Sequence, residues 1–298
     1  MQQAPDYLAI GHLTIDRRPD GTSVPGGTAL YSALLAARFG LRAAVLTRGR
    51  FDQIEDEQCR ELLGKFAGEI ELIVQESDEP TVFTNRTSAG RREQTIHSWA
   101  GEIDLNGLPP MWRSAKVIHL SPVAQEIDVR SAGRLSPDFF GITPQGLMRD
   151  WRSDQGGKVS IVPLRLAYEF LGRIDAMVLS SEEHSLARDE IEVVGSRGLV
   201  VITRGAAGLQ LTDRGQQSQL PAFSVNSKDD TGSGDVFSAA LFAERSRGVG
   251  VKRAATTGMA AAAVMIQTGG PDAIPTRDQV DAFLAEENRK AQQRHNVW

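Results

Sequence analysis

Short apolar runs alternate along most of the chain with segments whose apolar residues recur every three or four positions. The short runs are typical of buried strands, because both faces of such strands are apolar. They occur at residues 7–11, 43–47, 69–75, 116–121, 139–143, 159–162, 176–180 and 199–203, with two edge strands expected at 209–213 and 217–223. Helices are expected at residues 29–39, 56–67, 165–171, 181–195, 236–246, 252–267 and 277–294. The alternation predicts an α/β fold with a mainly parallel central sheet and helices on both faces.

One stretch departs from this alternation. Residues 80–87 and 93–100 are both rich in Thr, Val, Ile, Phe and Trp, and residues 88–91 between them have the composition of a turn. This pattern predicts a β-hairpin. Because the hairpin interrupts the strand–helix order, we expect it to project from the main sheet as a small lid. The economical interpretation is one domain over residues 1–298, with a lid contributed mainly by residues about 80–100.

Composition and charge exclude several classes of protein. The 298 residues are 41% hydrophobic and 24% charged, which is ordinary for a globular domain, and a net charge of −5 argues against nucleic-acid and membrane-surface binding. A single cysteine, Cys59, excludes an internal disulfide and fits a reducing compartment. The polar N-terminal residues do not resemble a signal peptide, and no apolar stretch is long enough to span a membrane. The sequence therefore predicts a cytoplasmic protein.

The strongest chemical signal is the stretch Asp-Asp-Thr-Gly-Ser-Gly-Asp-Val-Phe at residues 229–237. Glycines followed by an apolar, alanine-rich run predict a loop that turns sharply into a helix N-terminus. There the unpaired amides and the helix dipole favour an anion. Asp235 would lie beside that anion, where a carboxylate can serve as a base for an attacking hydroxyl. The alternative is that Asp235 only caps the helix.

Three more segments carry candidate ligand contacts. Asp16 follows the first predicted strand, at the edge of the sheet where α/β proteins bind ligands. Gly26 and Gly27 precede a helix, and Thr203-x-Gly205-x-x-Gly208 follows a core strand. The chain has no G-x-x-x-x-G-K-[ST] loop, no strand-linked G-x-G-x-x-G, no zinc-like histidine spacing and no G-x-S-x-G elbow.

These features, in this order, resemble the ribokinase-like (PfkB) carbohydrate kinases. Residues 229–235 resemble the C-terminal family signature D-T-x-G-[AS]-G-D. Residues 26–40 are similar to the N-terminal double-glycine segment, and residues 203–208 match the T-x-G-x-x-G nucleotide segment. The resemblance extends over essentially the whole chain, including the inserted hairpin. The C-terminal signature is specific by itself. The other two segments are individually weak, but together with the signature, in this order, they make the resemblance strong.

The resemblance implies a role for each of the matching residues. Asp235 would deprotonate the substrate hydroxyl, while the amides of Gly232, Ser233 and Gly234 would form the anion hole for the transferred γ-phosphoryl group. The acceptor would be held by Asp16, Gly26, Gly27 and Tyr31. The nucleotide would be held by Thr203, Gly205, Gly208 and Thr231.

The resemblance also implies the cofactors. ATP is expected as the donor, together with Mg²⁺. The family's Asn-x-x-Glu motif, which organises Mg²⁺ and phosphate, matches residues 180–183. Glu183 is retained, but Ser180 replaces the Asn. Many family members also bind a monovalent cation such as K⁺ near the start of the signature, where Asp229 is the candidate.

Departures from the family pattern bear on the acceptor. Ribokinases have Lys and Asn where this chain has Thr28 and Tyr31, which argues against ribose. The double-glycine segment, together with residues 119–123 and 143–146, is more similar to the inositol-kinase-like branch. We therefore predict an ATP-dependent kinase that phosphorylates a hydroxyl of a small cyclic polyol or sugar, with an inositol-like acceptor favoured.

Two alternatives to this prediction stay open. A nucleoside kinase of the same fold could stack a base on Tyr31. A non-catalytic sugar- or nucleotide-binding sensor is favoured by Ser180 and disfavoured by the intact Asp235. The expected oligomeric state is a monomer or a homodimer formed through the lid.

Overall fold

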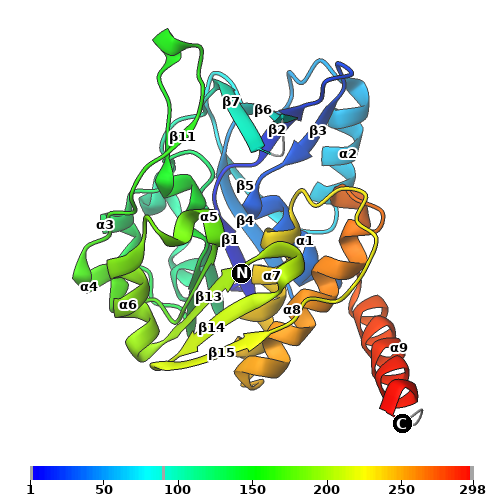
Figure 1. The fold of residues 1–298 in the computed structure, drawn as a ribbon. Helices are drawn as coiled ribbons and strands as arrows, with labels where there is room; N and C mark the ends of the chain where they lie inside the picture. The colour runs from blue at the N-terminus through cyan, green and yellow to red at the C-terminus, as the bar shows by residue number, and fades with distance from the viewer. Residues whose placement is uncertain (1–2, 89–90, 296–298) are drawn as a thin grey trace.

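The computed structural model describes residues 3–88 and 91–295, and its centre is a nine-stranded sheet (Figure 1). In spatial order its strands are β15 (Gln216–Leu220), β14 (Leu209–Asp213), β13 (Leu199–Thr203), β12 (Ala176–Ser180), β9 (Phe139–Ile142), β8 (Val117–Leu120), β1 (Tyr7–Ile10), β4 (Ala43–Arg48) and β5 (Glu71–Gln75). Every pair from β13 to β5 is parallel, whereas β14 and β15 add antiparallel strands at one edge. The predicted mainly parallel sheet is confirmed.

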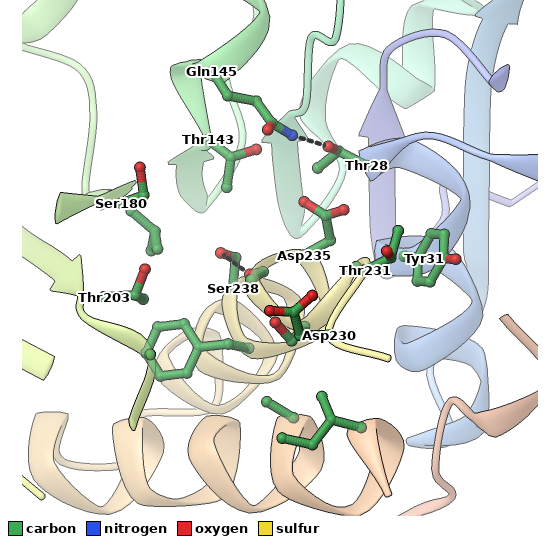
Figure 2. Close-up of a pocket in the computed structure, with 18 of the residues that line it drawn as sticks. Thr28, Tyr31, Thr143, Gln145, Ser180, Thr203, Asp230, Thr231, Asp235 and Ser238 are labelled. Atoms are coloured by element: carbon green, nitrogen blue, oxygen red, sulfur yellow. Dashed lines mark hydrogen bonds between the residues drawn. The ribbon is translucent and has the colours of Figure 1, made fainter. Parts of the chain in front are cut away.

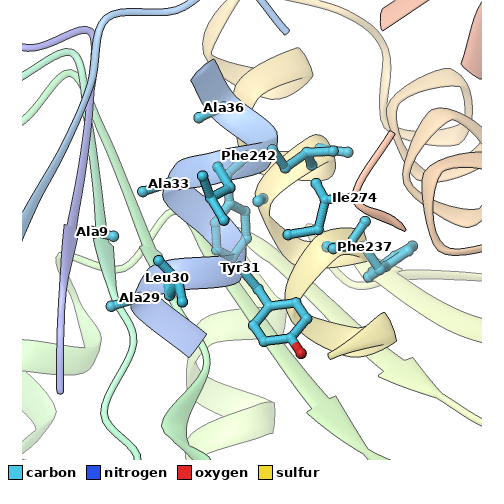
Figure 3. Close-up of a cluster of buried hydrophobic side chains, with 14 of the residues drawn as sticks. Ala9, Ala29, Leu30, Tyr31, Ala33, Ala36, Phe237, Phe242 and Ile274 are labelled. Carbon is cyan, nitrogen blue, oxygen red and sulfur yellow. The ribbon is translucent and has the colours of Figure 1, made fainter. Parts of the chain in front are cut away.

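The two faces of the sheet bury separate apolar clusters, because successive side chains of a strand point to opposite faces. On β1, Tyr7 and Ala9 belong to one cluster, and Leu8 and Ile10 to the other. The first face is covered by α1 (Thr28–Arg38), α2 (Glu57–Ala67), α7 (Ser233–Ser246) and α8 (Val251–Ile266), as Figure 3 shows for α1 and α7. The second is covered by α3 (Val129–Ala132), α4 (Tyr168–Leu171) and α6 (Arg188–Arg197). Helices therefore lie on both faces, as predicted.

The lid is larger than the sequence predicts. Its hairpin consists of β6 (Thr81–Ser88) and β7 (Arg91–Ser98), which confirms the prediction, although residues 89–90 of the expected turn lie outside the described residues. Two further strands, β2 (Thr14–Arg17) and β3 (Ser23–Gly26), complete a four-stranded sheet in the order β3-β2-β6-β7. The sequence does not predict these two strands, because they are short and half polar.

The apolar run at residues 159–162 is not a strand of the central sheet. The chain instead forms a small hairpin from β10 (Arg149–Asp150) and β11 (Ser160–Ile161), and Ile161 is 47% exposed. The segment before β11 lies along β7, where the Ile96 amide donates to the Gly157 carbonyl at 2.9 Å and the Val159 amide to the Gln94 carbonyl at 2.9 Å. Part of the lid edge that could have paired with a second copy is thus already occupied.

The helix expected over residues 181–195 is two helices, α5 (Ser181–His184) and α6. The break follows from a competing hydrogen bond, since the Leu186 carbonyl accepts from the Leu164 amide at 2.9 Å instead of continuing a helical ladder. The remaining helix, α9 (Arg277–His295), extends away from the body of the molecule (Figure 1). Within residues 3–88 and 91–295, we find no helix that is both long and apolar enough to cross a membrane.

Two neighbouring glycines test the contact between the β10–β11 hairpin and the lid. Both Gly156 and Gly157 have positive φ, at 74° and 70°, but a Cβ on Gly157 would lie 2.0 Å from the Ile96 carbonyl oxygen, whereas one on Gly156 meets open space. Because the left-handed backbone conformation is unfavourable for alanine, both alanine variants should have a free energy of unfolding lower by about 1–2 kcal/mol. We expect only Gly157→Ala to speed hydrogen exchange at the Ile96 amide. Equal exchange in both variants would show that this contact does not hold the hairpin to the lid.

Candidate active site

A cavity of about 810 Å³ opens where the lid faces the carboxyl ends of the parallel strands and the N-terminus of α7 (Figure 2). This is the edge of an α/β sheet at which ligands gather, and the volume suits a small-molecule site. Most of the predicted site residues line it. They are Asp16, Gly27, Tyr31, Glu183, Thr203, Gly205, Gly208, Thr231, Gly232, Ser233, Gly234 and Asp235.

The N-terminus of α7 forms the floor of this cavity. Gly232 is its N-cap, in the left-handed conformation with φ 82°, and Asp235 lies in the first helical turn. The Ser233 amide donates to the Asp230 carbonyl at 3.1 Å, and the helix dipole adds partial positive charge at this end of the helix. Figure 2 shows the Asp235 carboxylate directed into the cavity. The N-terminus of α7 and the Asp235 carboxylate therefore lie side by side at the cavity.

Tyr31 on α1 holds the glycine turn in place. A Cβ on Gly232 would lie 2.3 Å from a ring carbon of Tyr31, so the ring packs directly against the glycine. The ring is only 4% exposed, which leaves little surface on which a base could stack. Burial, assisted by the carboxylates of Asp16 and Asp235, raises the pKa of Tyr31, so the phenol keeps its proton. Tyr31 thus stabilises the turn by packing against Gly232.

The loop that leads into α7 is fixed by its own hydrogen bonds. The Asp229 carboxylate accepts from the Thr231 amide at 2.9 Å, and the Lys228 amide donates to the Ile266 carbonyl at 2.8 Å, at the end of α8. Asp229, the candidate for a monovalent cation, is absent from the cavity lining, whereas Asp230 belongs to it. The Asp229 carboxylate therefore shapes the loop.

One end of the cavity is mostly apolar. Thr203, at the end of β13, donates its hydroxyl to the Leu179 carbonyl at 3.2 Å, and Gly205 and Gly208 follow in the next turn. Beyond them, apolar side chains from the loop after β15 and from α8 line the wall. They are Ala222, Phe223, Val225, Met259, Ala262, Ala263 and Ile266. An apolar slot next to an anion-binding turn can hold an aromatic base attached to phosphates.

Glu183 faces the cavity from α5, where it also has a structural partner. Its carboxylate accepts from the Ser180 amide at 2.7 Å, which forms a capping box at the start of the helix. Among the described residues, no group of three or more His, Cys, Asp or Glu side chains could hold a metal ion alone. A metal ion at Glu183 would therefore have to be coordinated in part by the ligand itself.

The opposite end of the cavity is polar and is formed around Asp16 on β2. The Asp16 carboxylate accepts from the Thr14 hydroxyl at 3.1 Å and from the Asn85 side-chain amide at 3.5 Å. Gly26 does not line the cavity, but a Cβ there would lie 2.8 Å from an Asp16 oxygen, so the glycine leaves room for the carboxylate. Of the predicted acceptor residues, Asp16 and Gly27 thus face this end directly.

The structure adds polar residues at this end that the sequence did not single out as site residues. Gln94 donates to the Asn85 carbonyl oxygen at 2.6 Å, across the β6–β7 pair. Gln145 donates to the Thr28 hydroxyl at 2.6 Å, as Figure 2 shows. Neither pair stands out in the sequence, because amides are common in strands and turns. The available signal was the polar segment at 143–146, directly after a buried strand.

Arg149 closes the polar end from the β10–β11 hairpin. Its guanidinium group donates to the Val123 carbonyl at 2.8 Å and to the Gln145 side-chain oxygen at 3.2 Å. It also lies over the ring of Phe83, 5.5 Å from the centroid, and Phe83 is only 3% exposed. The two aromatic rings at this end, Tyr31 and Phe83, are therefore covered, and hydrogen-bonding groups dominate the remaining surface.

Comparison with known proteins agrees with this geometry. Residues 173–277 match the family model of the pfkB family carbohydrate kinases, and this stretch contains the glycine turn, Asp235 and the apolar end of the cavity. This part of the chain is similar to the pfkB family carbohydrate kinases. The chain is a phosphotransferase that acts on hydroxyl acceptors, and its broad class is that of the sugar and nucleoside kinases.

Relatives of this chain differ in their named acceptors and donors. A cytidine kinase of Thermococcus kodakarensis is 25% identical over 287 residues, which are 89% of this chain and 97% of the relative. A pyrophosphate-dependent kinase of the ribokinase family, complexed with a pyrophosphate analog and myo-inositol, has a TM-score of 0.74 at 19% identity, with 93% and 99% of the two chains covered.

A second solved structure supports the same fold. Ribokinase of Arabidopsis thaliana, complexed with ribose and ATP, has a TM-score of 0.70 at 18% identity and covers 95% of this chain and 99% of its own. At these identities the structural likenesses show the fold alone. The donor and the acceptor of this chain therefore have to be inferred from its own residues.

Alanine substitutions at two glycines of the α7 N-terminus should change stability in opposite directions. Gly232→Ala introduces left-handed strain and a clash with Tyr31, so it should lower the free energy of unfolding by about 2 kcal/mol or more. Gly234→Ala lies within the helix, where a Cβ meets open space, and should raise it by about 0.5–1 kcal/mol. Urea unfolding of both variants checks this. A neutral Gly232→Ala would mean that Tyr31 does not constrain the turn.

Proposed function

We propose that this protein transfers the γ-phosphoryl group of ATP to a hydroxyl of a small cyclic polyol or sugar, with an inositol-like acceptor favoured. The observation that carries the proposal is the position of Asp235. It lies beside the amides of the α7 N-terminus, between an apolar end and a polar end of one cavity. A donor and an acceptor could thus meet at this carboxylate.

The chemistry follows from this arrangement. Phosphoryl transfer depends on positioning and on the stabilisation of charge on the phosphoryl oxygens, which the N-terminus of α7 can supply. Asp235 takes the proton of the attacking hydroxyl, whose oxygen forms the new bond to phosphorus while the bond to the leaving diphosphate breaks. The lid, with Asp16 at its base, holds the acceptor and excludes water.

The apolar slot supports ATP over pyrophosphate as the donor. Pyrophosphate needs only the anion site, whereas the cavity is also lined, beyond the Thr203–Gly208 turn, by Val225 and by Met259 and Ala262 of α8. Adenine fits such a slot by burial of its ring faces. Mg²⁺ would arrive with the nucleotide and would be held near Glu183, where it neutralises phosphate charge.

The polar end of the cavity supports a polyol over a nucleoside. Asp16, Asn85, Gln94, Gln145 and Arg149 offer hydrogen-bonding groups on several sides of this space. A base would need an exposed ring to stack on, and both candidate rings are almost fully covered. The likeness to a cytidine kinase keeps a nucleoside acceptor as the second candidate.

Asp235→Asn tests the base. The amide keeps the size of the side chain but cannot accept the proton, so kcat should fall by about 10²–10⁴-fold. The free energy of unfolding should stay near that of the wild type, because the side chain faces the cavity. Asp230→Asn, a neighbouring change in the cavity lining, provides the matched control. Turnover by Asp235→Asn at the wild-type rate would remove Asp235 from the mechanism.

A panel of acceptors and donors tests the substrate class. Inositols, pentoses, hexoses and nucleosides are each supplied with ATP-Mg²⁺ or with pyrophosphate-Mg²⁺, and phosphate monoester formation is followed by ³¹P NMR. We expect turnover with ATP and a cyclic polyol. Turnover confined to nucleosides would favour the second candidate, and turnover confined to pyrophosphate would contradict the role of the apolar slot. No turnover with any pair, together with ligand-induced thermal stabilisation, would favour a binding sensor.

A further inference from the structure

We propose that the Thr143 hydroxyl is a fixed hydrogen-bond donor to an oxygen atom of the acceptor, and that Tyr7 and His119 are positioning residues that set its direction. The proposal rests on the proposed function, because it concerns the polar end of the same cavity. It adds a contact on the side of the sheet, opposite the contacts that the lid provides.

A buried chain of hydrogen bonds crosses three neighbouring strands below the polar end. Tyr7 lies on β1, His119 on β8, and Thr143 directly after β9. The Tyr7 hydroxyl oxygen lies 2.8 Å from His119 Nδ1, and His119 Nε2 lies 2.9 Å from Thr143 Oγ1. Tyr7 and His119 are fully buried, whereas Thr143 at the far end of the chain lines the cavity. The chain therefore connects the core of the sheet to the site.

The packing of the His119 ring fixes its orientation relative to α7. The ring meets Phe242 edge to face, with centroids 4.9 Å apart and planes at 89°. Phe242 lies two turns after Asp235 on α7, and residues seven apart share a face of a helix. The imidazole that contacts Thr143 is thus held by the helix that carries the proposed base.

The two titratable members of the chain, Tyr7 and His119, are neutral near pH 7. Burial lowers the pKa of His119 to about 3 and raises the pKa of Tyr7 well above its ordinary value. A neutral imidazole has one donor nitrogen and one acceptor nitrogen. The chain can therefore run in one of two directions, and the direction decides whether Thr143 offers the cavity a proton or only a lone pair.

Ser32 on α1 decides between the two directions. Its hydroxyl is fully buried and makes no hydrogen bond within the described residues, but it lies close enough to the Tyr7 hydroxyl to lower the pKa of that phenol, against the larger effect of burial. If the Ser32 hydroxyl turns to donate to the Tyr7 oxygen, the Tyr7 proton goes to His119 Nδ1, so Nε2 carries the imidazole proton and donates to Thr143. The opposite direction would leave the Ser32 proton without an acceptor in the core, which is costly.

It follows that the Thr143 proton is directed into the cavity. Its oxygen already accepts from His119 Nε2, so its own proton is free to serve a ligand. Figure 2 shows Thr143, Gln145 and Asp235 around the same space. Asp235 accepts a proton and Thr143 donates one, so the pair suits an acceptor with two adjacent oxygens, such as a vicinal diol. One hydroxyl would react while its neighbour accepts from Thr143.

The competing explanation is that the chain only satisfies buried polar groups. In that case Thr143 matters for stability, and its loss leaves the affinity for the acceptor unchanged. Three variants separate the two explanations. Thr143→Val keeps the shape and removes the hydroxyl, Thr143→Ser keeps the hydroxyl, and Tyr7→Phe removes the group that sets the direction from the other end of the chain.

The test measures KM and kcat for the acceptor identified by the panel, KM for the donor, and thermal unfolding. We expect Thr143→Val to raise the acceptor KM by about 5- to 100-fold, Thr143→Ser to stay within about 3-fold of the wild type, and the donor KM to hold in both. Tyr7→Phe should raise the acceptor KM less than Thr143→Val does. An unchanged acceptor KM in Thr143→Val, or an equal loss in Thr143→Ser, would overturn the proposal.

A second measurement does not depend on activity. The ¹⁵N NMR shifts of His119, assigned by comparison with His119→Gln, report which ring nitrogen carries the proton. We expect protonated Nε2 in the wild type and a mixture of tautomers in Tyr7→Phe. A proton on Nδ1 in the wild type would refute the direction of the chain even if the kinase activity is confirmed. Lack of turnover with the expected tautomer would instead count against the proposed function.

Discussion

The contact between Tyr31 and Gly232 is the constraint on which the site depends. Helix α7 must begin where its N-terminus faces the carboxyl edge of the sheet, and the left-handed turn at Gly232 sets that point. Because the ring of Tyr31 occupies the space of a side chain at Gly232, the first turns of α1 and α7 are fixed relative to each other. The acceptor segment that precedes α1 and the proposed base on α7 therefore come from one packed unit.

The lid and the β10–β11 hairpin place polar groups above this unit. Gln94 is bonded to Asn85, which is bonded to Asp16, and the backbone of Gln94 also accepts from the hairpin at Val159. The hairpin in turn carries Arg149, whose guanidinium group is held by the Gln145 side chain. Acceptor contacts from the lid and from the main body thus belong to one connected network, which suits a site that must hold a ring with several hydroxyls.

How much of this could be predicted from the sequence depended on whether the determining interaction was local. The alternation of strands and helices predicted the sheet, and the glycine-rich turn predicted the α7 N-terminus, because both patterns lie in consecutive residues. The run at 159–162 was assigned to the wrong sheet, since its partners are residues 149–150 and β7. Arg149 and the chain from Tyr7 to Thr143 were missed because strand order, which no local pattern specifies, brings them together.

In the proposed mechanism, the α7 amides bind the terminal phosphate of the donor while Asp235 takes the proton of the acceptor hydroxyl that attacks it. A crystal structure with a non-hydrolysable ATP analogue and the acceptor would test it most directly. We expect a terminal phosphate against the amides of residues 232–235 and one acceptor hydroxyl within about 3 Å of the Asp235 carboxylate, in line with that phosphate. A terminal phosphate bound away from α7, or an acceptor whose hydroxyls all lie beyond the reach of Asp235, would contradict it.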